Sequence, residues 1–86
     1  MRHARADDLE PLTDLLRGLR ALPQLRERTP GSFSLRSNGF LHFHVDGNEL
    51  WADVKVPGPE FDRRPATTTS EQHALLALVT AYLDGG

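Results

Sequence analysis

The sequence contains no cysteine, which excludes a disulfide, a thiolate nucleophile and a cysteine-ligated zinc site. It also has no long apolar run, since the longest, residues 74–79, is far too short to span a membrane. The arginine-containing start is followed by acidic rather than apolar residues, so we predict no targeting segment. The formal net charge is only -2, which disfavours nucleic-acid binding. We therefore expect a cytoplasmic protein without a membrane partner.

Length and composition predict one soluble domain over residues 1–86, whose stability must come from packing. We expect residues 1–6 to form a flexible polar tail. Leucines then recur at spacings of three and four, which predicts an amphipathic helix over residues 7–22. We expect a connector from Leu25 to Pro30, where Pro30-Gly31 marks a turn.

Alternating apolar and polar residues predict a three-stranded antiparallel meander over residues 32–56. A two-residue loop at Asn38-Gly39 would mix core and surface side chains. We therefore favour a three-residue loop that adds Ser37, with Gly39 left-handed in a bulge. That register gives two cross-strand pairs: Leu35 with Leu41, and Phe33 with Phe43.

The last third of the chain predicts one strand and one helix. Residues 60–64 are expected to add a short edge strand, and a capping box begun by Thr68 or Thr69 predicts a helix over residues 69–84. Both helices need an apolar partner, and the sheet offers one apolar face. The predicted fold class is therefore α+β: helix, three- or four-stranded antiparallel sheet, helix, with both helices on one face of the sheet.

Parity along the meander divides its side chains between two faces. The expected core face carries Leu41, Phe43, Val45, Leu50, Ala52, Val54 and Val56. The opposite face is polar apart from two aromatic residues, and carries Ser34, Arg36, Phe40, His42, His44, Glu49, Trp51, Asp53 and Lys55. We expect a ligand to bind on this second face, with seven candidate residues: Ser34, Arg36, Phe40, His42, His44, Trp51 and Asp53.

His42 and His44 project from the same side of one strand, and imidazole is a common ligand of zinc and other transition metals. A third ligand would come from the next strand, as Glu49 or Asp53. The turn between these strands can close in two ways. A two-residue turn places His44 opposite Glu49 and His42 opposite Trp51; a four-residue turn places His42 opposite Asp53 and His44 opposite Trp51. A divalent metal held by these histidines and a carboxylate is therefore one hypothesis, and we expect His3 and His73 to lie elsewhere on the surface.

Phe40 and Trp51 would form an apolar patch on this polar face, which is typical of a surface that seats a ligand, a protein partner or a second copy. A Ser34, His42 and Asp53 triad can be drawn there, but a flat sheet offers no oxyanion hole, so we assign no catalytic residue. The sequence thus favours a binding or interaction module over an enzyme. A small metal-dependent enzyme and a homodimer remain alternatives.

Residues 40–47, Phe-Leu-His-Phe-His-Val-Asp-Gly, and residues 51–57, Trp-Ala-Asp-Val-Lys-Val-Pro, resemble the H-x-H-x-D-G and A-D-[IV] strands of small actinobacterial-type proteins described as luciferase-domain-containing. Residues 22–27, Leu-Pro-Gln-Leu-Arg-Glu, are similar to the opening of MmcQ/YjbR-like proteins. These resemblances imply a small antiparallel sheet with helices, and the second implies DNA binding. This chain is shorter than both patterns, so family residues beyond the last helix have no counterpart in it.

Overall fold

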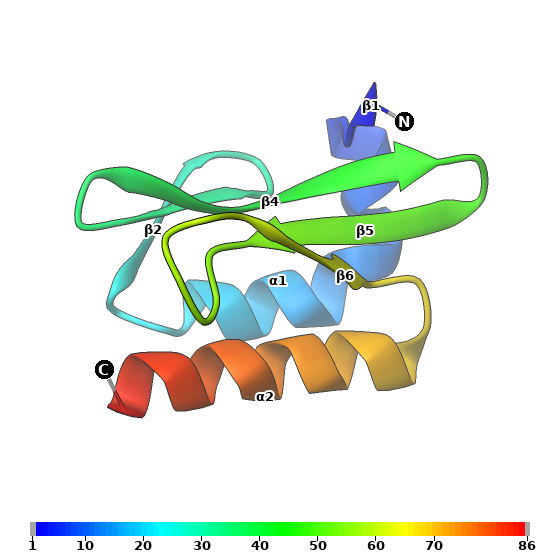
Figure 1. The fold of residues 1–86 in the computed structure, drawn as a ribbon. Coiled ribbons are helices and arrows are strands. Elements are labelled where there is room, and N and C mark those ends of the chain that lie inside the picture. Colours follow the sequence, from blue (N-terminus) through cyan, green and yellow to red (C-terminus); the bar gives the residue numbers. More distant parts are fainter. Residues whose placement is uncertain (1, 86) are drawn as a thin grey trace.

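Six antiparallel strands form one sheet in a computed structural model that describes residues 2–85. The strands lie in the order β2-β3-β4-β5-β6, and the short β1 pairs with β4 (Figure 1). In chain order the elements are β1 (Arg2–His3), a 3₁₀ helix η1 (Ala6–Leu12), α1 (Thr13–Arg20), β2 (Leu25–Thr29), β3 (Ser32–Leu35), β4 (Asn38–Asp46), β5 (Glu49–Val54), β6 (Asp62–Pro65) and α2 (Thr69–Gly85). The α+β class is confirmed, but the sheet is larger than predicted.

The two additional strands lie where a tail and a connector were expected. Arg2–His3 forms β1 against β4, so the prediction of a flexible tail is wrong for these residues, while Met1 lies outside the described residues. Leu25–Thr29 forms β2 against β3. Its sequence, Leu-Arg-Glu-Arg-Thr, lacks apolar alternation, so the pattern of apolar residues does not predict a strand. Backbone pairing with β3 stabilises this strand at the edge of the sheet.

The predicted first helix is in fact two segments. Residues from Ala6 to Leu12 wind as a 3₁₀ helix that contains Pro11, which has no amide proton for an α-helical hydrogen bond. The α-helix proper runs only from Thr13 to Arg20. The last helix agrees with prediction, and its capping box is the Thr68 alternative: the Glu71 N–H donates to Thr68 Oγ1 at 3.1 Å, and the Thr68 N–H donates to Glu71 Oε1 at 3.0 Å.

The hydrophobic core lies between the sheet and the helices. In Figure 1, α1 and α2 run side by side beneath the strands. Gly18 permits this approach, since a Cβ atom there would stand 2.5 Å from a methyl carbon of Leu76. The core includes the inner-face side chains Leu41, Phe43, Leu50, Ala52, Val54 and Val56, as parity predicted. Within residues 2–85, neither helix is long and apolar enough to cross a membrane.

The first hairpin has a different register from the one predicted. Its turn consists of Arg36 and Ser37, both with positive φ (53° and 72°), so Asn38 pairs with Leu35. The predicted loop and its two cross-strand pairs are therefore wrong. A bulge follows, in which Phe40 is the extra residue of β4.

This bulge turns Phe40 into the core, because two residues of β4 oppose one residue of β3 and parity is interrupted. Phe40 and its neighbour Leu41 are both buried, at 2% and 1% exposure. The Phe40 ring stacks on Tyr82 of α2, with centroids 6.1 Å apart. The placement of Phe40 on the outer face is therefore wrong.

The second hairpin sets the register of the outer face. His42 pairs with Asp53 and His44 with Trp51, which is the register we assigned to a four-residue turn. The additional pair Asp46–Glu49 shortens the loop to Gly47 and Asn48, with Gly47 at φ 60°. The alternative that placed His44 opposite Glu49 is wrong.

Candidate functional site

Three histidines from two strands meet on the outer face of the sheet. His42 and His44 project from the same side of β4, as predicted. His3 is the direct cross-strand partner of His44, so pairing between β1 and β4 brings a third imidazole to this face. The prediction that His3 lies away from this face is wrong, whereas His73 is exposed on α2.

The three imidazoles are close enough to share one ion. Their ring centroids are separated by 4.6 Å for His3 and His44, 4.8 Å for His42 and His44, and 5.4 Å for His3 and His42. One potential ligand atom from each ring lies within 4.8 Å of the other two. A tetrahedral zinc ion, with Zn–N distances of about 2.0–2.1 Å, holds its nitrogens about 3.4 Å apart, so small side-chain rotations would close the site.

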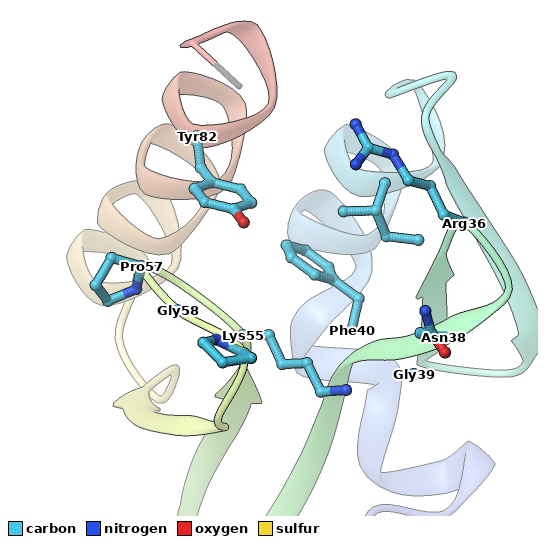
Figure 2. Close-up of a pocket in the computed structure, with 10 residues that line it drawn as sticks. Arg36, Asn38, Gly39, Phe40, Lys55, Pro57, Gly58 and Tyr82 are labelled. Atoms are coloured by element: carbon cyan, nitrogen blue, oxygen red, sulfur yellow. The ribbon is translucent and has the colours of Figure 1, made fainter.

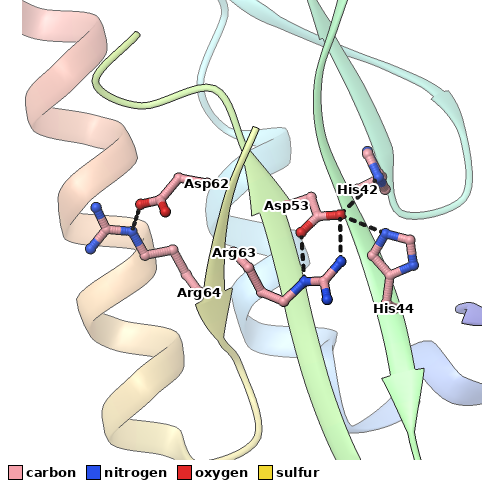
Figure 3. Close-up of polar contacts among 6 residues, drawn as sticks. All are labelled: His42, His44, Asp53, Asp62, Arg63 and Arg64. Atoms are coloured by element: carbon pink, nitrogen blue, oxygen red, sulfur yellow. Dashed lines mark hydrogen bonds and ion pairs between the residues drawn. The ribbon is translucent and has the colours of Figure 1, made fainter. Parts of the chain in front are cut away.

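Asp53 on β5 faces His42 and His44 (Figure 3). Its Oδ2 lies 2.8 Å from Nε2 of His44 and 3.5 Å from Nε2 of His42. The His44 contact is short, but its direction does not suit a hydrogen bond, and this buried nitrogen has no hydrogen-bond partner in the described structure. Two imidazole nitrogens and a carboxylate oxygen therefore converge.

Arg63 on β6 holds Asp53 from the other side (Figure 3). Its Nε donates to Oδ1 at 3.1 Å and its Nη2 to Oδ2 at 3.4 Å. The shorter bond engages the oxygen that points away from the histidines. Arg63 thus orients the carboxylate and leaves Oδ2 directed at His42 and His44, as the outer partners of metal ligands commonly do.

Electrostatics favour the neutral form of His42 and the ionised form of Asp53. Burial lowers the pKa of His42 below its ordinary 6.5, the nearby His44 adds to this, and Asp53 opposes it only in part. Burial by itself raises the pKa of Asp53, but the hydrogen bond from Arg63 and the charges of His44, Arg63 and His42 outweigh it and lower the pKa below 3.8. Both protonation states are the ones that bind a metal cation.

Asp53→Asn is expected to lower the free energy of unfolding by about 1 kcal/mol at neutral pH. This is the contribution of the charged hydrogen bond to Arg63, reduced because solvent screens the half-exposed Arg63 side chain. Because the folded-state pKa of Asp53 is lowered, its contribution is complete above the ordinary carboxyl pKa and disappears as pH falls through the folded-state value. Urea titrations should therefore show a difference that is present above the ordinary carboxyl pKa and shrinks as the pH falls below it. Asp14→Asn, at an exposed position, is the control and should change stability little at any pH. A difference that did not shrink in acid would contradict this assignment.

Aromatic side chains border the histidine cluster. The Phe61 ring meets His42 edge-on at 4.8 Å, and at 45% exposure Phe61 is the exposed large hydrophobic residue of the described chain. The Lys55 ammonium lies 5.0 Å from the centre of the Phe61 ring. Trp51 is half-buried and is the cross-strand neighbour of His44. Trp51 is therefore retained on the face as predicted, while Phe61 takes the place that the sequence suggested for Phe40.

Three other predicted residues do not join this cluster. Ser34 is 5% exposed and its hydroxyl accepts a hydrogen bond from Arg28 Nε at 3.0 Å. Arg36 stands in the turn before β4, at the opposite end of that strand from Asp46. Glu49 is exposed at the second turn, where it pairs with Asp46 rather than with a histidine.

Sequence reasoning missed His3 and Arg63 because both reach the site through long-range pairing. A two-residue strand such as β1 has no periodicity to detect. Its position depends on a turn in which Asp8 Oδ2 accepts from the Arg5 N–H at 2.9 Å and from Arg2 Nη1 at 2.7 Å. The signal that could have indicated this turn is the acidic pair that follows the arginines.

Comparison of the chain with family models, curated proteins and solved structures found no match.

Proposed function

We propose that this protein binds a divalent transition-metal ion of the zinc class through His3, His42 and His44, with Asp53 Oδ2 as the fourth ligand. The observation that carries the proposal is the cluster of three imidazoles, whose ligand atoms lie within 4.8 Å of one another, with Asp53 Oδ2 2.8 Å from His44 Nε2 and 3.5 Å from His42 Nε2. Neutral imidazole and carboxylate ligands without thiolate suit zinc, and also nickel or copper.

A purely structural role explains this cluster less well. Gathering three imidazoles places like charges together whenever they are protonated, and Asp53 offsets this for His42 only in part. A bound cation would take neutral imidazoles as ligands and so remove that repulsion. It would also give Arg63 a function, since two hydrogen bonds from this guanidinium fix the orientation of the Asp53 carboxylate toward a ligand.

The proposal concerns binding and not turnover. The histidines stand on the face of a sheet, and we assign them no substrate cleft. The core between the sheet and the helices supports a placement of both helices on the opposite face (Figure 1). The expectation of a cytoplasmic binding module is kept, with the metal as its ligand.

Isothermal titration calorimetry with zinc tests the proposal. The wild type should bind one zinc ion per chain, and the double variant His42→Ala/His44→Ala should give no binding heat. His3→Ala should weaken binding at least about tenfold, because it removes one of four ligands. His73→Ala is the matched control, since it removes an exposed histidine on α2, and should bind as the wild type does.

Cobalt(II) supplies a second measurement, because its visible absorption reports the number and geometry of its ligands. Wild-type protein should give the intense bands of a four-coordinate site, and the double variant should not. The absence of binding heat in the wild type, or equal heat in the double variant, would refute the proposal.

A further inference from the structure

A separate pocket is lined by residues other than the clustered histidines (Figure 2). It is formed by the β3–β4 turn, by residues 55–59 after β5, and by the C-terminal part of α2. Its volume is about 470 Å³, and an adjoining hollow of about 310 Å³ shares Leu35, Arg36 and Tyr82 with it. Volumes of this size are typical of sites for small organic molecules.

Arg36 places a positive charge at this pocket. Within residues 2–85 it forms no salt bridge, as is also true of Arg5, Arg26 and Arg28, whereas the other arginines each contact a carboxylate. Figure 2 shows Arg36 and Tyr82 approaching the pocket from opposite sides. Lys55 also lines the pocket, and its ammonium lies 5.0 Å from the centre of the Phe61 ring. Arg36 is the one guanidinium among the pocket's lining residues.

The turn that presents Arg36 is an unfavourable one for this sequence. Arg36 and Ser37 both adopt positive φ, at 53° and 72°, a region that residues with a side chain rarely occupy. Asn-Gly is the favoured pair for such a turn, and Asn38-Gly39 stands two residues later, in the strand. Backbone strain of this kind gathers at ligand-binding positions, where it serves to aim a side chain.

The rest of the pocket offers aromatic and apolar surface. Tyr82 is half-buried and stacks on Phe40 with an interplanar angle of 22°. Its hydroxyl, which points into the pocket in Figure 2, forms no hydrogen bond in the part of the chain that the structure describes. A ring entering the pocket would meet Tyr82 and Leu35, and a polar group on it could bond the hydroxyl.

We propose that this pocket binds a small aromatic carboxylate. The carboxylate pairs with the Arg36 guanidinium, which matches its two oxygens with two N–H donors, and the ring packs against Tyr82 and Leu35. One guanidinium balances one negative charge, so a monocarboxylate fits better than a polyphosphate. The proposal is independent of the metal site.

The probe for the test is 3-phenylpropionate, compared with neutral 3-phenylpropanol, in buffer containing EDTA. In a ¹⁵N–¹H correlation spectrum the carboxylate should shift the amide signals of residues 35–40 and 82–83. Arg36→Gln should weaken its binding about tenfold or more, the loss of one charged hydrogen-bonded pair. Arg26→Gln, on the exposed strand β2, should bind as the wild type does. The alcohol should bind more weakly and should not distinguish Arg36→Gln from the wild type.

Arg36→Gly separates ligand binding from folding. Glycine accepts positive φ without strain, so the melting temperature should rise by about 2–5 °C while binding of 3-phenylpropionate is lost. The variant His42→Ala/His44→Ala should bind the carboxylate normally, which keeps this result distinct from the zinc titration. Absence of amide shifts at millimolar probe, equal affinity of Arg36→Gln and wild type, or equal affinity for the alcohol would overturn the proposal.

Discussion

Phe40→Ala is expected to lower the free energy of unfolding by about 3–5 kcal/mol, the usual loss when a buried phenylalanine is truncated. The ring is 2% exposed and stacks on Tyr82, so its removal leaves a cavity between β4 and α2. Small domains are stable by only about 5–15 kcal/mol, and the variant should therefore be close to unfolding at room temperature. Urea denaturation followed by far-UV circular dichroism measures the change.

The control is Phe61→Ala, since Phe61 is 45% exposed on the outer face. It should cost less than about 1 kcal/mol. If Phe40→Ala does not fold, Phe40→Leu, with an expected loss of about 1–2 kcal/mol, keeps the comparison measurable. Strict alternation along β4 would place Phe40 on the surface, so equal and small effects at both positions would contradict the bulge.

Zinc is expected to raise the melting temperature of the wild type by about 10–20 °C when its free concentration is one hundred times the dissociation constant. Binding to the native state alone stabilises it by about 2.7 kcal/mol under that condition, and a domain of this size gains about 4–8 °C per kcal/mol. The physical reason is that the ligands on β1 and β4 come together only in the folded protein, where these two strands pair. The unfolded chain has no preformed site for the ion. Differential scanning fluorimetry with and without EDTA measures the shift.

The variants of the metal ligands distinguish this stabilisation from nonspecific binding. His42→Ala/His44→Ala should show no rise, His3→Ala a smaller rise than the wild type at the same zinc concentration, and His73→Ala the full rise. An equal rise in the double variant would place the bound ion elsewhere and contradict the assignment of ligands.

Prediction from sequence succeeded where the signal was local. The apolar alternation of β4 and β5 correctly assigned Phe43, Ala52 and Val54 to the core, and the capping residues correctly located the start of α2. Prediction failed where an extra residue interrupts the alternation of a strand. The bulge at Phe40 is a single extra residue, and nothing in the pattern of apolar residues distinguishes it from an ordinary strand position.

The candidate site divides in the same way. His42 and His44 share a face because strand residues alternate, and either turn that we considered placed a carboxylate opposite one of them. Pairing between β4 and β5 then selected Asp53 and left Glu49 at the turn. His3 and Arg63, by contrast, reach the site because β1 pairs with β4 and β6 pairs with β5.

The sequence alone therefore determined the α+β class, the inner and outer faces of the central strands, and two of the three clustered histidines. These depend on periodicity and turn chemistry within a few residues. Only the tertiary structure decided that Phe40 is buried, that His3 lies beside His42 and His44, and that Arg36 lines a separate pocket. Each of these depends on backbone hydrogen bonds between distant segments, and a polar two-residue strand or a bulge carries no pattern of its own from which such pairing follows.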